Sequence, residues 1–154
     1  MEKRFGGKWI LLLRLHPQIV ARHLNDLQNV KNIIDISLQD DMYEILAGCD
    51  AFLTDYSSAA FDAAIMRIPV FLYADDYIEY ERERGKLLWD LKNDKFPFPF
   101  AISNDELESC ILNFDEKEYQ RKLRELFFEA SVKEDGDSAS KVADFIDNVI
   151  GGSV

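Results

Sequence analysis

The chain has 154 residues, with 18 basic and 29 acidic side chains and a formal net charge of −11 at pH 7. This length suits one ordinary domain, which buries about two thirds of the surface that its unfolded chain exposes. A hydrophobic content of 47% excludes a disordered acidic tail. The negative charge opposes non-specific binding to nucleic acid and to anionic membranes and, at first sight, binding of anionic ligands.

The two cysteines and the apolar runs indicate the compartment. Cys49 and Cys110 stand in apolar segments outside any CxxC pair, which predicts buried, reduced thiols. No run approaches the roughly 20 apolar residues of a membrane-spanning helix, and no signal peptide is visible. We therefore expect a cytoplasmic protein. The N-terminal MEKRFGGKW leads almost directly into a strand, which suggests a piece of a longer protein.

Short apolar runs alternate with helical patterns along most of the chain. The predicted strands are 10–15, 32–37, 51–54, 68–73 and 100–102. The predicted helices are 18–28, 42–48, 59–66, 75–85, 104–112, 116–131 and 138–150. Because the strand runs are continuously apolar, they predict an α/β fold with a buried parallel sheet and helices on both faces. We expect one domain over 1–154, with C-terminal helices over 116–150.

The strongest candidate for chemistry is the segment Thr54–Ser58, between a buried strand and a helix. Ligands of parallel α/β sheets bind at the carboxyl ends of the strands. A helix N-terminus offers unpaired N–H groups and partial positive charge, which suit phosphate oxygens, and Ser57 and Ser58 add hydroxyl donors. The alternative is that one serine merely caps the helix.

A histidine and an arginine flank the end of the first predicted strand. His16 lies at its carboxyl end, before a proline, where it can donate to a phosphate or act as acid or base. The alternative is a loop histidine bonded to the backbone. Arg14 lies inside the strand and is expected to pair with an acid. His23, in the middle of the next helix, is expected to be structural.

Further charged residues are predicted near the same edge. Asp55 and Asp62 are candidates for orienting His16 or a substrate hydroxyl, and Asp62 is costly to bury unpaired. Arg82 and Arg84 follow the fourth strand, and a guanidinium group suits a diphosphate through paired hydrogen bonds. The alternative for Arg82 is an exposed ion pair with neighbouring glutamates.

Several familiar motifs are missing from the sequence. It contains no GxGxxG after the first strand, no GxxxxGK[ST], no GxSxG and no His/Cys metal spacing. Dinucleotide-binding, P-loop and serine-hydrolase functions therefore lose support. The adjacent acids Asp40-Asp41 and Asp75-Asp76 are expected to serve turns or helix caps rather than a metal.

Several segments of the sequence together form a specific combination. They are LRLHP (13–17), the helix 42–49, DAFLTDYSSAAFD (50–62), PVFLY (69–73), Tyr80, Arg84-Gly85 and DGDSAS (135–140). In this order the chain resembles the CDP-glycerol glycerophosphotransferases, which are teichoic-acid primases and polymerases, over their C-terminal, donor-binding half. LRxHP together with TDYSS and the following FD is much more specific than either piece alone.

The resemblance implies a fold, a reaction and roles for residues. The fold is one half of a GT-B glycosyltransferase architecture, with this chain as one Rossmann-like domain and the N-terminal half absent. The reaction transfers glycerol phosphate from CDP-glycerol to an acceptor hydroxyl and releases CMP, in the synthesis of teichoic acid or a similar surface polysaccharide. His16 corresponds to a functionally essential histidine, and Ser57 and Ser58 to serines that hold the donor phosphates.

The chain departs from the family in three places. Tyr80-Glu81-Arg82 stands in place of Tyr-Arg-Asp, KLLWD (86–90) in place of an aromatic Phe-Tyr-Phe-Asp, and FPFP (96–99) in place of a Pro-Gly-Pro-like segment. All three fall in the loop that should shape the nucleotide or acceptor side. They leave open a different polyol or a sugar-phosphate donor.

We therefore expect a CDP-glycerol glycerophosphotransferase-like transferase whose donor site lies in this chain. His16 is the expected catalytic residue; the expected donor-phosphate ligands are Ser57, Ser58 and Arg84, and the supporting residues are Asp55, Asp62 and Arg14. CDP-glycerol is a substrate, and no cofactor or metal is expected, because fixed donors can stabilise the leaving group.

The remaining expectations concern partners and alternatives. The base for the acceptor hydroxyl should come from the absent half, so the isolated chain is expected to fold but to be inactive. The acceptor is lipid-linked or polymeric, nucleic acid is not a partner, and the full-length protein is expected at the inner face of the cell membrane. The alternative functions are a GT-B glycosyltransferase that uses a nucleotide-sugar and a non-catalytic α/β binding module.

Overall fold

The structure is a computed structural model that describes residues 1–16, 31–133 and 135–151. The predicted helix 18–28, with His23, lies outside these residues. The chain divides into two compact units. The first comprises Met1–Lys86 with Phe98–Phe114, and the second comprises Leu87–Pro97 with Asp115–Val154. The expectation of a single domain over 1–154 stays a prediction.

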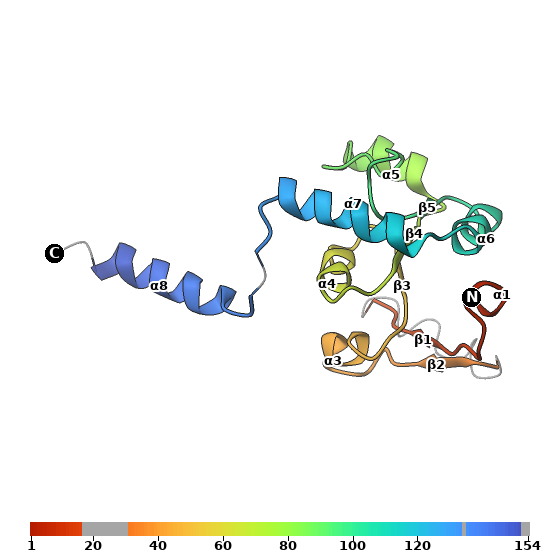
Figure 1. The fold of residues 1–154 in the computed structure, drawn as a ribbon, viewed down its shortest axis with the longest axis horizontal. Coiled ribbons are helices and arrows are strands. Elements are labelled where there is room, and N and C mark those ends of the chain that lie inside the picture. Colours follow the sequence, from red (N-terminus) through yellow and green to blue (C-terminus); the bar gives the residue numbers. More distant parts are fainter. Residues whose placement is uncertain (17–30, 134, 152–154) are drawn as a thin grey trace. The chain divides into compact units, whose positions relative to one another are not determined.

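The strands of the first unit form two parallel sheets within the described residues (Figure 1). In one sheet β1 (Leu11–Leu13) pairs with β2 (Ile33–Asp35). In the other, β4 (Val70–Tyr73) lies between β3 (Phe52–Thr54) and β5 (Phe100–Ala101). The strands fall inside the predicted runs, and their parallel pairing is the one that continuous apolar runs favour.

Apart from a short helix at the N-terminus, the described helices follow the predicted segments closely. In the first unit they are α1 (Glu2–Phe5), α3 (Met42–Leu46), α4 (Ala59–Ile65), α5 (Tyr77–Arg84) and α6 (Asn104–Leu112). In the second unit they are α7 (Glu116–Glu129) and α8 (Ser138–Gly151). Side chains cap several of them: Asp41 accepts from two amides at the start of α3, and Ser103 accepts from the Glu106 amide in α6.

The core of the first unit is built around β4 and α4. Phe71 on β4 is only 2% exposed, and its ring lies 5.1 Å from that of Phe114. On α4 the buried side chains are the alanines 59, 60, 63 and 64, whose small size lets a helix approach a sheet closely. The two half-buried cysteines, Cys49 and Cys110, are free, and partial burial raises the pKa of both thiols.

The N-terminus differs from the sequence-based expectation. The chain begins with the short helix α1 rather than leading directly into a strand. Long-range contacts explain this helix, because the Arg4 guanidinium donates to the carbonyl oxygen of Phe114 at 2.8 Å. The Phe5 ring lies 6.1 Å from the Phe114 ring. Both contacts span more than 100 residues, and local sequence patterns do not report them.

The first strand is more exposed than its apolar run suggests. Leu11 and Leu12 of β1 are 48% and 36% exposed, so the expectation of a buried strand is wrong for these two residues. Within the described residues β1 pairs only with β2, which leaves its other edge open. The buried strand is instead β4, which has a neighbour on each side.

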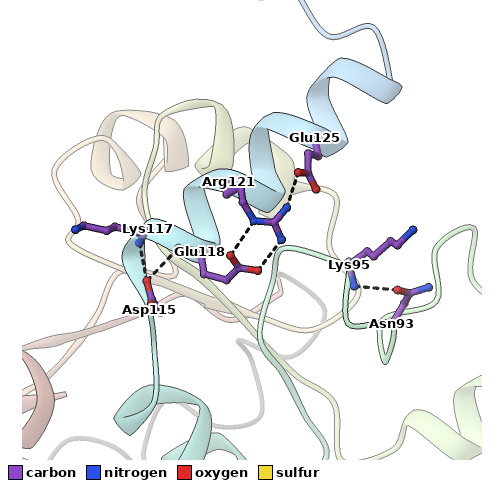
Figure 2. Close-up of polar contacts among 7 residues, drawn as sticks. All are labelled: Asn93, Lys95, Asp115, Lys117, Glu118, Arg121 and Glu125. Atoms are coloured by element: carbon purple, nitrogen blue, oxygen red, sulfur yellow. Dashed lines mark hydrogen bonds and ion pairs between the residues drawn. The ribbon is translucent and has the colours of Figure 1, made fainter.

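In the second unit, hydrogen bonds at one end of α7 and ion pairs along it support the helix (Figure 2). The Asp115 carboxylate accepts from the amides of Lys117 and Glu118 at 2.9 and 3.0 Å. One turn later, the Arg121 guanidinium binds the carboxylates of Glu118 and Glu125. The hydrogen bonds from Arg121 lower the pKa of Glu118. The two ion pairs of Arg121 lie within one helix and are spaced by three and four residues.

The last helix confirms the predicted segment 138–150, and several of its apolar side chains are exposed. The exposed residues are Val142, Phe145, Ile146, Val149 and Ile150. Of the helices that the structure describes, none has both the length and the apolar character needed to cross a membrane.

Candidate functional site

The serine turn, residues 55–58, joins the end of β3 to the start of α4. Ser57 and Ser58 are both exposed there. The Ser57 hydroxyl oxygen accepts from the Ala59 amide at 3.3 Å, a long hydrogen bond. Ser58 occupies the cap position of α4, but its hydroxyl makes no hydrogen bond within the described residues. Helix capping therefore uses little of the hydrogen-bonding capacity of the Ser57 and Ser58 hydroxyls. Both hydroxyls can still bind a ligand.

Tyr56 ties the serine turn to α5. Its ring stacks on that of Tyr80, with centroids 3.8 Å apart and the planes at 17°. Its hydroxyl donates to the Asp76 carboxylate at 2.7 Å. Burial and this hydrogen bond raise the pKa of Tyr56. Sequence reasoning missed the role of Tyr56, because its partners lie 20 and 24 residues away and no local pattern connects them.

Asp76 lies in the turn before α5 and occupies the cap position of that helix, in line with the expected turn or cap role. Its side chain nevertheless makes no cap hydrogen bond. The carboxylate instead accepts from Tyr56. The side chain of Asp76 therefore joins two elements rather than capping its own helix.

The two arginines of α5 differ in their partners. The Arg82 guanidinium lies 3.1 Å from the Glu79 carboxylate and 4.0 Å from that of Glu83, so the exposed ion-pair alternative holds for this residue. Arg84, the last residue of α5, is exposed, and its side chain makes no hydrogen bond or ion pair within the described residues. Of these two guanidinium groups, Arg84 is the one that an anion can bind without breaking an existing pair.

The segment after β1 is bound to the turn that follows β2. The Arg14 guanidinium donates to the carbonyl oxygen of Gln39 at 2.6 Å, and the Leu15 amide donates to the Ser37 hydroxyl at 2.9 Å. The expectation that Arg14 lies inside the strand and pairs with an acid is wrong, because β1 ends one residue earlier and the partner is a carbonyl group. His16 follows in this segment and is exposed.

The two candidate aspartates lie in different surroundings. Asp62 on α4 is half-buried, and its carboxylate accepts from the Tyr43 hydroxyl of α3 at 3.1 Å, which raises the pKa of Tyr43. Asp62 is therefore paired, as its place on an alanine-rich helix requires. Asp55 is exposed in the serine turn, and its side chain makes no hydrogen bond within the described residues.

The structure brings the serine turn against α5 through Tyr56 and joins α3 to α4 through Asp62. Within the described residues, no hydrogen bond or ion pair connects any two of Ser57, Ser58, Arg84, Asp55, Asp62 and Arg14. Their action in one site stays a prediction. In the part of the chain that the structure describes, no group of three or more His, Cys, Asp or Glu side chains is arranged to hold a metal ion.

Comparison with known families decides the broad assignment. Residues 1–148 match the model of the family described as CDP-Glycerol:Poly(glycerophosphate) glycerophosphotransferase. The chain belongs to this family. The match includes the serine turn, His16 and Arg84, so the resemblance inferred from the LRxHP and TDYSS motifs is confirmed.

Curated glycerophosphotransferase relatives are much longer than this chain. It is 28% identical over 153 residues to a teichoic acid poly(glycerol phosphate) polymerase of Staphylococcus epidermidis, with 95% of this chain and 20% of that protein covered. It is 30% identical to a teichoic acid glycerol-phosphate transferase of Staphylococcus aureus, with 95% and 37% covered. It is 27% identical to a teichoic acid ribitol-phosphate primase of Bacillus spizizenii, with 92% and 35% covered. The chain thus spans between a fifth and little more than a third of these relatives.

A solved structure matches the fold of the chain. The wall teichoic acid polymerase TagF aligns with a TM-score of 0.72 and 29% identity over 98% of this chain and 37% of that one. A structure of a TagF variant with CDPG also aligns with a TM-score of 0.72, at 27% identity. These matches confirm the predicted fold class, a Rossmann-like α/β fold that forms one part of a GT-B architecture.

Proposed function

We propose that this chain supplies the donor-binding surface of an enzyme that transfers glycerol phosphate from CDP-glycerol to an acceptor hydroxyl, in the synthesis of teichoic acid or a similar polymer. One observation carries the proposal. Within the region that matches the family, the turn after β3 presents two exposed serine hydroxyls, and Arg84 presents a guanidinium group without an acidic partner in the described residues. Such donors suit the oxygens of a diphosphate.

The reaction makes and breaks one bond to phosphorus. The acceptor oxygen bonds to the phosphorus of the glycerol phosphate group, and the bond from that phosphorus to the bridging oxygen of the diphosphate breaks. CMP leaves with the bridging oxygen, and a base takes the proton of the acceptor hydroxyl. Negative charge grows on the leaving phosphate, so donors aimed at it stabilise the transition state more than the ground state.

Each predicted site residue has a role in this proposal. Ser57 and Ser58 donate to the diphosphate oxygens, while His16 and Arg84 offset the charge that develops on the leaving group. Asp55, Asp62 and Arg14 support this arrangement. CDP-glycerol is the substrate, and no cofactor is needed for the step. The acceptor is lipid-linked or polymeric, and the complete enzyme acts in the cytoplasm at the inner face of the membrane.

Titration calorimetry with the 154-residue chain tests the donor assignment. CDP-glycerol should bind more tightly than UDP-sugars or GDP-sugars. The double change Ser57→Ala with Ser58→Ala should weaken CDP-glycerol binding by about tenfold or more, because hydrogen bonds to charged oxygens are the stronger ones. Arg84→Ala should weaken it to a similar extent. Arg82→Ala is the matched control and should change the Kd by less than about twofold, because that guanidinium group is already paired.

The outcomes of this titration separate the candidate functions. A clear preference for a nucleotide-sugar would favour the glycosyltransferase alternative. Unchanged affinity for every ligand in the double serine variant would favour a non-catalytic module. CDP-ribitol belongs in the same series, because one relative is a ribitol-phosphate primase. Tighter binding of CDP-ribitol would make ribitol phosphate the transferred group.

A further inference from the structure

We propose that Tyr56 is a positioning residue of the donor site, which holds the serine turn against α5 and sets the face of α5 that carries Arg84. This inference rests on the proposed function and deepens it. It assigns no contact between Tyr56 and the donor. Tyr56 acts through Ser57 and Ser58, which follow it directly in the chain, and through the helix on which it packs.

Tyr56 is fixed at two points of one helix. Its hydroxyl donates to Asp76, immediately before α5, and its ring stacks on Tyr80, one turn later. Asp76 and Tyr80 are themselves joined, because the Tyr80 amide donates to the carbonyl oxygen of Asp76 at 2.9 Å. A stack and a hydrogen bond to neighbouring points restrict both the position and the rotation of the ring.

The spacing along α5 places Arg84 on the helix face that Tyr56 contacts. Asp76, Tyr80 and Arg84 are each four residues apart, and residues at this spacing share one face of a helix. The face that Tyr56 contacts is therefore the face on which Arg84 lies. By fixing the rotation of α5 about its axis, Tyr56 keeps the Arg84 face on the same side as the serine turn.

The contact between Tyr56 and α5 differs from ordinary core packing. Tyr56 and Tyr80 are both half-exposed, whereas the buried core of this unit is centred on β4 and α4. The Asp76 carboxylate makes no cap hydrogen bond in its own helix, although it occupies the cap position. The carboxylate instead contributes to the link between the two elements.

The test compares two tyrosines of the same region that each donate to a carboxylate. Tyr56→Phe removes the hydroxyl that reaches Asp76 and keeps the ring. Tyr77→Phe is the matched control, because it removes a hydroxyl that donates to Glu81 at 2.8 Å inside α5. Two quantities are measured for each variant: the Kd for CDP-glycerol, and hydrogen exchange at the Ala60 and Phe61 amides.

Those two amides report directly on the turn. The Ala60 amide donates to the carbonyl oxygen of Ser57 at 3.2 Å, and the Phe61 amide donates to that of Ser58 at 2.9 Å. Tyr56→Phe should speed their exchange and raise the Kd about fivefold, the effect expected from the loss of one hydrogen bond. Tyr77→Phe should leave the exchange rates and the Kd within about twofold of their values in the unchanged chain.

A second set of variants tests the geometry of the link. Asp76→Ala should reproduce the effect of Tyr56→Phe, and the double variant should be no worse than either single change, because both remove the same hydrogen bond. Tyr80→Phe should match the unchanged chain, since it keeps the ring, whereas Tyr80→Leu should weaken CDP-glycerol binding. Full additivity in the double variant would overturn the proposal.

The remaining outcomes separate this inference from the proposed function. Failure of the unchanged chain to bind CDP-glycerol would refute the donor assignment, and exchange at Ala60 and Phe61 would then decide alone whether Tyr56 holds the turn. Faster exchange in Tyr56→Phe with an unchanged Kd would overturn the positioning role and leave a structural one. Equal effects in Tyr56→Phe and Tyr77→Phe would also overturn it.

Discussion

The phenol of Tyr56 makes alkaline pH a probe of the link between the serine turn and α5. Burial and the hydrogen bond to Asp76 raise the pKa of Tyr56 above its ordinary value of 10.0, so the folded chain favours the neutral phenol. The stabilisation is fully present below pH 10 and is lost as the pH rises towards the folded-state pKa. We expect the free energy of unfolding to fall more steeply above pH 10 in the unchanged chain than in Tyr56→Phe.

Urea unfolding at several pH values between 8 and 11 measures this difference. Tyr43→Phe serves as the comparison, because Tyr43 is a second tyrosine whose pKa is raised by a hydrogen bond to an aspartate, Asp62. Tyr43 is exposed and belongs to α3. Identical pH curves for Tyr56→Phe and the unchanged chain would contradict the assigned hydrogen bond.

For single residues, the sequence predicts the position along an element but not the contacts with other side chains. A sequence pattern places Ser57, Ser58 and Arg84 near the ends of strands or on the following helix. It does not distinguish Arg84 from Arg82, because that distinction depends on which guanidinium group meets a glutamate. It also cannot find the pairing of Tyr56 with Asp76, since such a contact depends on how separate elements pack rather than on local spacing.

At the scale of elements, the start of α7 offers a test of local stability (Figure 2). The Asp115 side chain satisfies two backbone amides that the helix itself leaves unpaired. Asp115→Ala should lower the free energy of unfolding by about 1 kcal/mol, whereas Asp115→Ser keeps a capping oxygen and should lower it by less. Chemical denaturation monitored by circular dichroism gives both values.

A matched control separates capping from loss of charge. Asp94 is exposed, and its side chain makes no hydrogen bond or ion pair within the described residues. Asp94→Ala should therefore change the free energy of unfolding by less than about 0.5 kcal/mol. Equal losses in the Asp115 and Asp94 variants would show that charge, rather than the cap, stabilises the start of α7.

Most elements were predictable because their signals are local. The continuous apolar runs identify β3 and β4, and the spacing of apolar side chains identifies α7 and α8. The helix α1 has no such signal and depends on its contacts with Phe114, far along the chain. The exposure of β1 was likewise unpredictable, because an apolar run indicates a strand without showing how many neighbours it has.

At the scale of the whole molecule, the net charge of the chain and the charge of the proposed ligand are both negative. A chain of charge −11 repels a diphosphate at long range, whereas the serine hydroxyls and Arg84 act only at contact distance. Net charge therefore bears on the rate of encounter with the donor and says little about the affinity of the formed complex. The two effects can be separated by varying the salt concentration.

Salt should accelerate the association of CDP-glycerol with this chain. The screening length falls from about 30 Å at 0.01 M to about 8 Å at 0.15 M salt, which removes the long-range repulsion. We expect the association rate constant, measured by NMR line shapes, to rise about twofold to fivefold over this range. Cytidine carries no phosphate and should associate at a rate that salt leaves unchanged. A rate that falls with salt would show that local cations such as Arg84 dominate the encounter, and that the acidic surface lies away from the approach to the donor site.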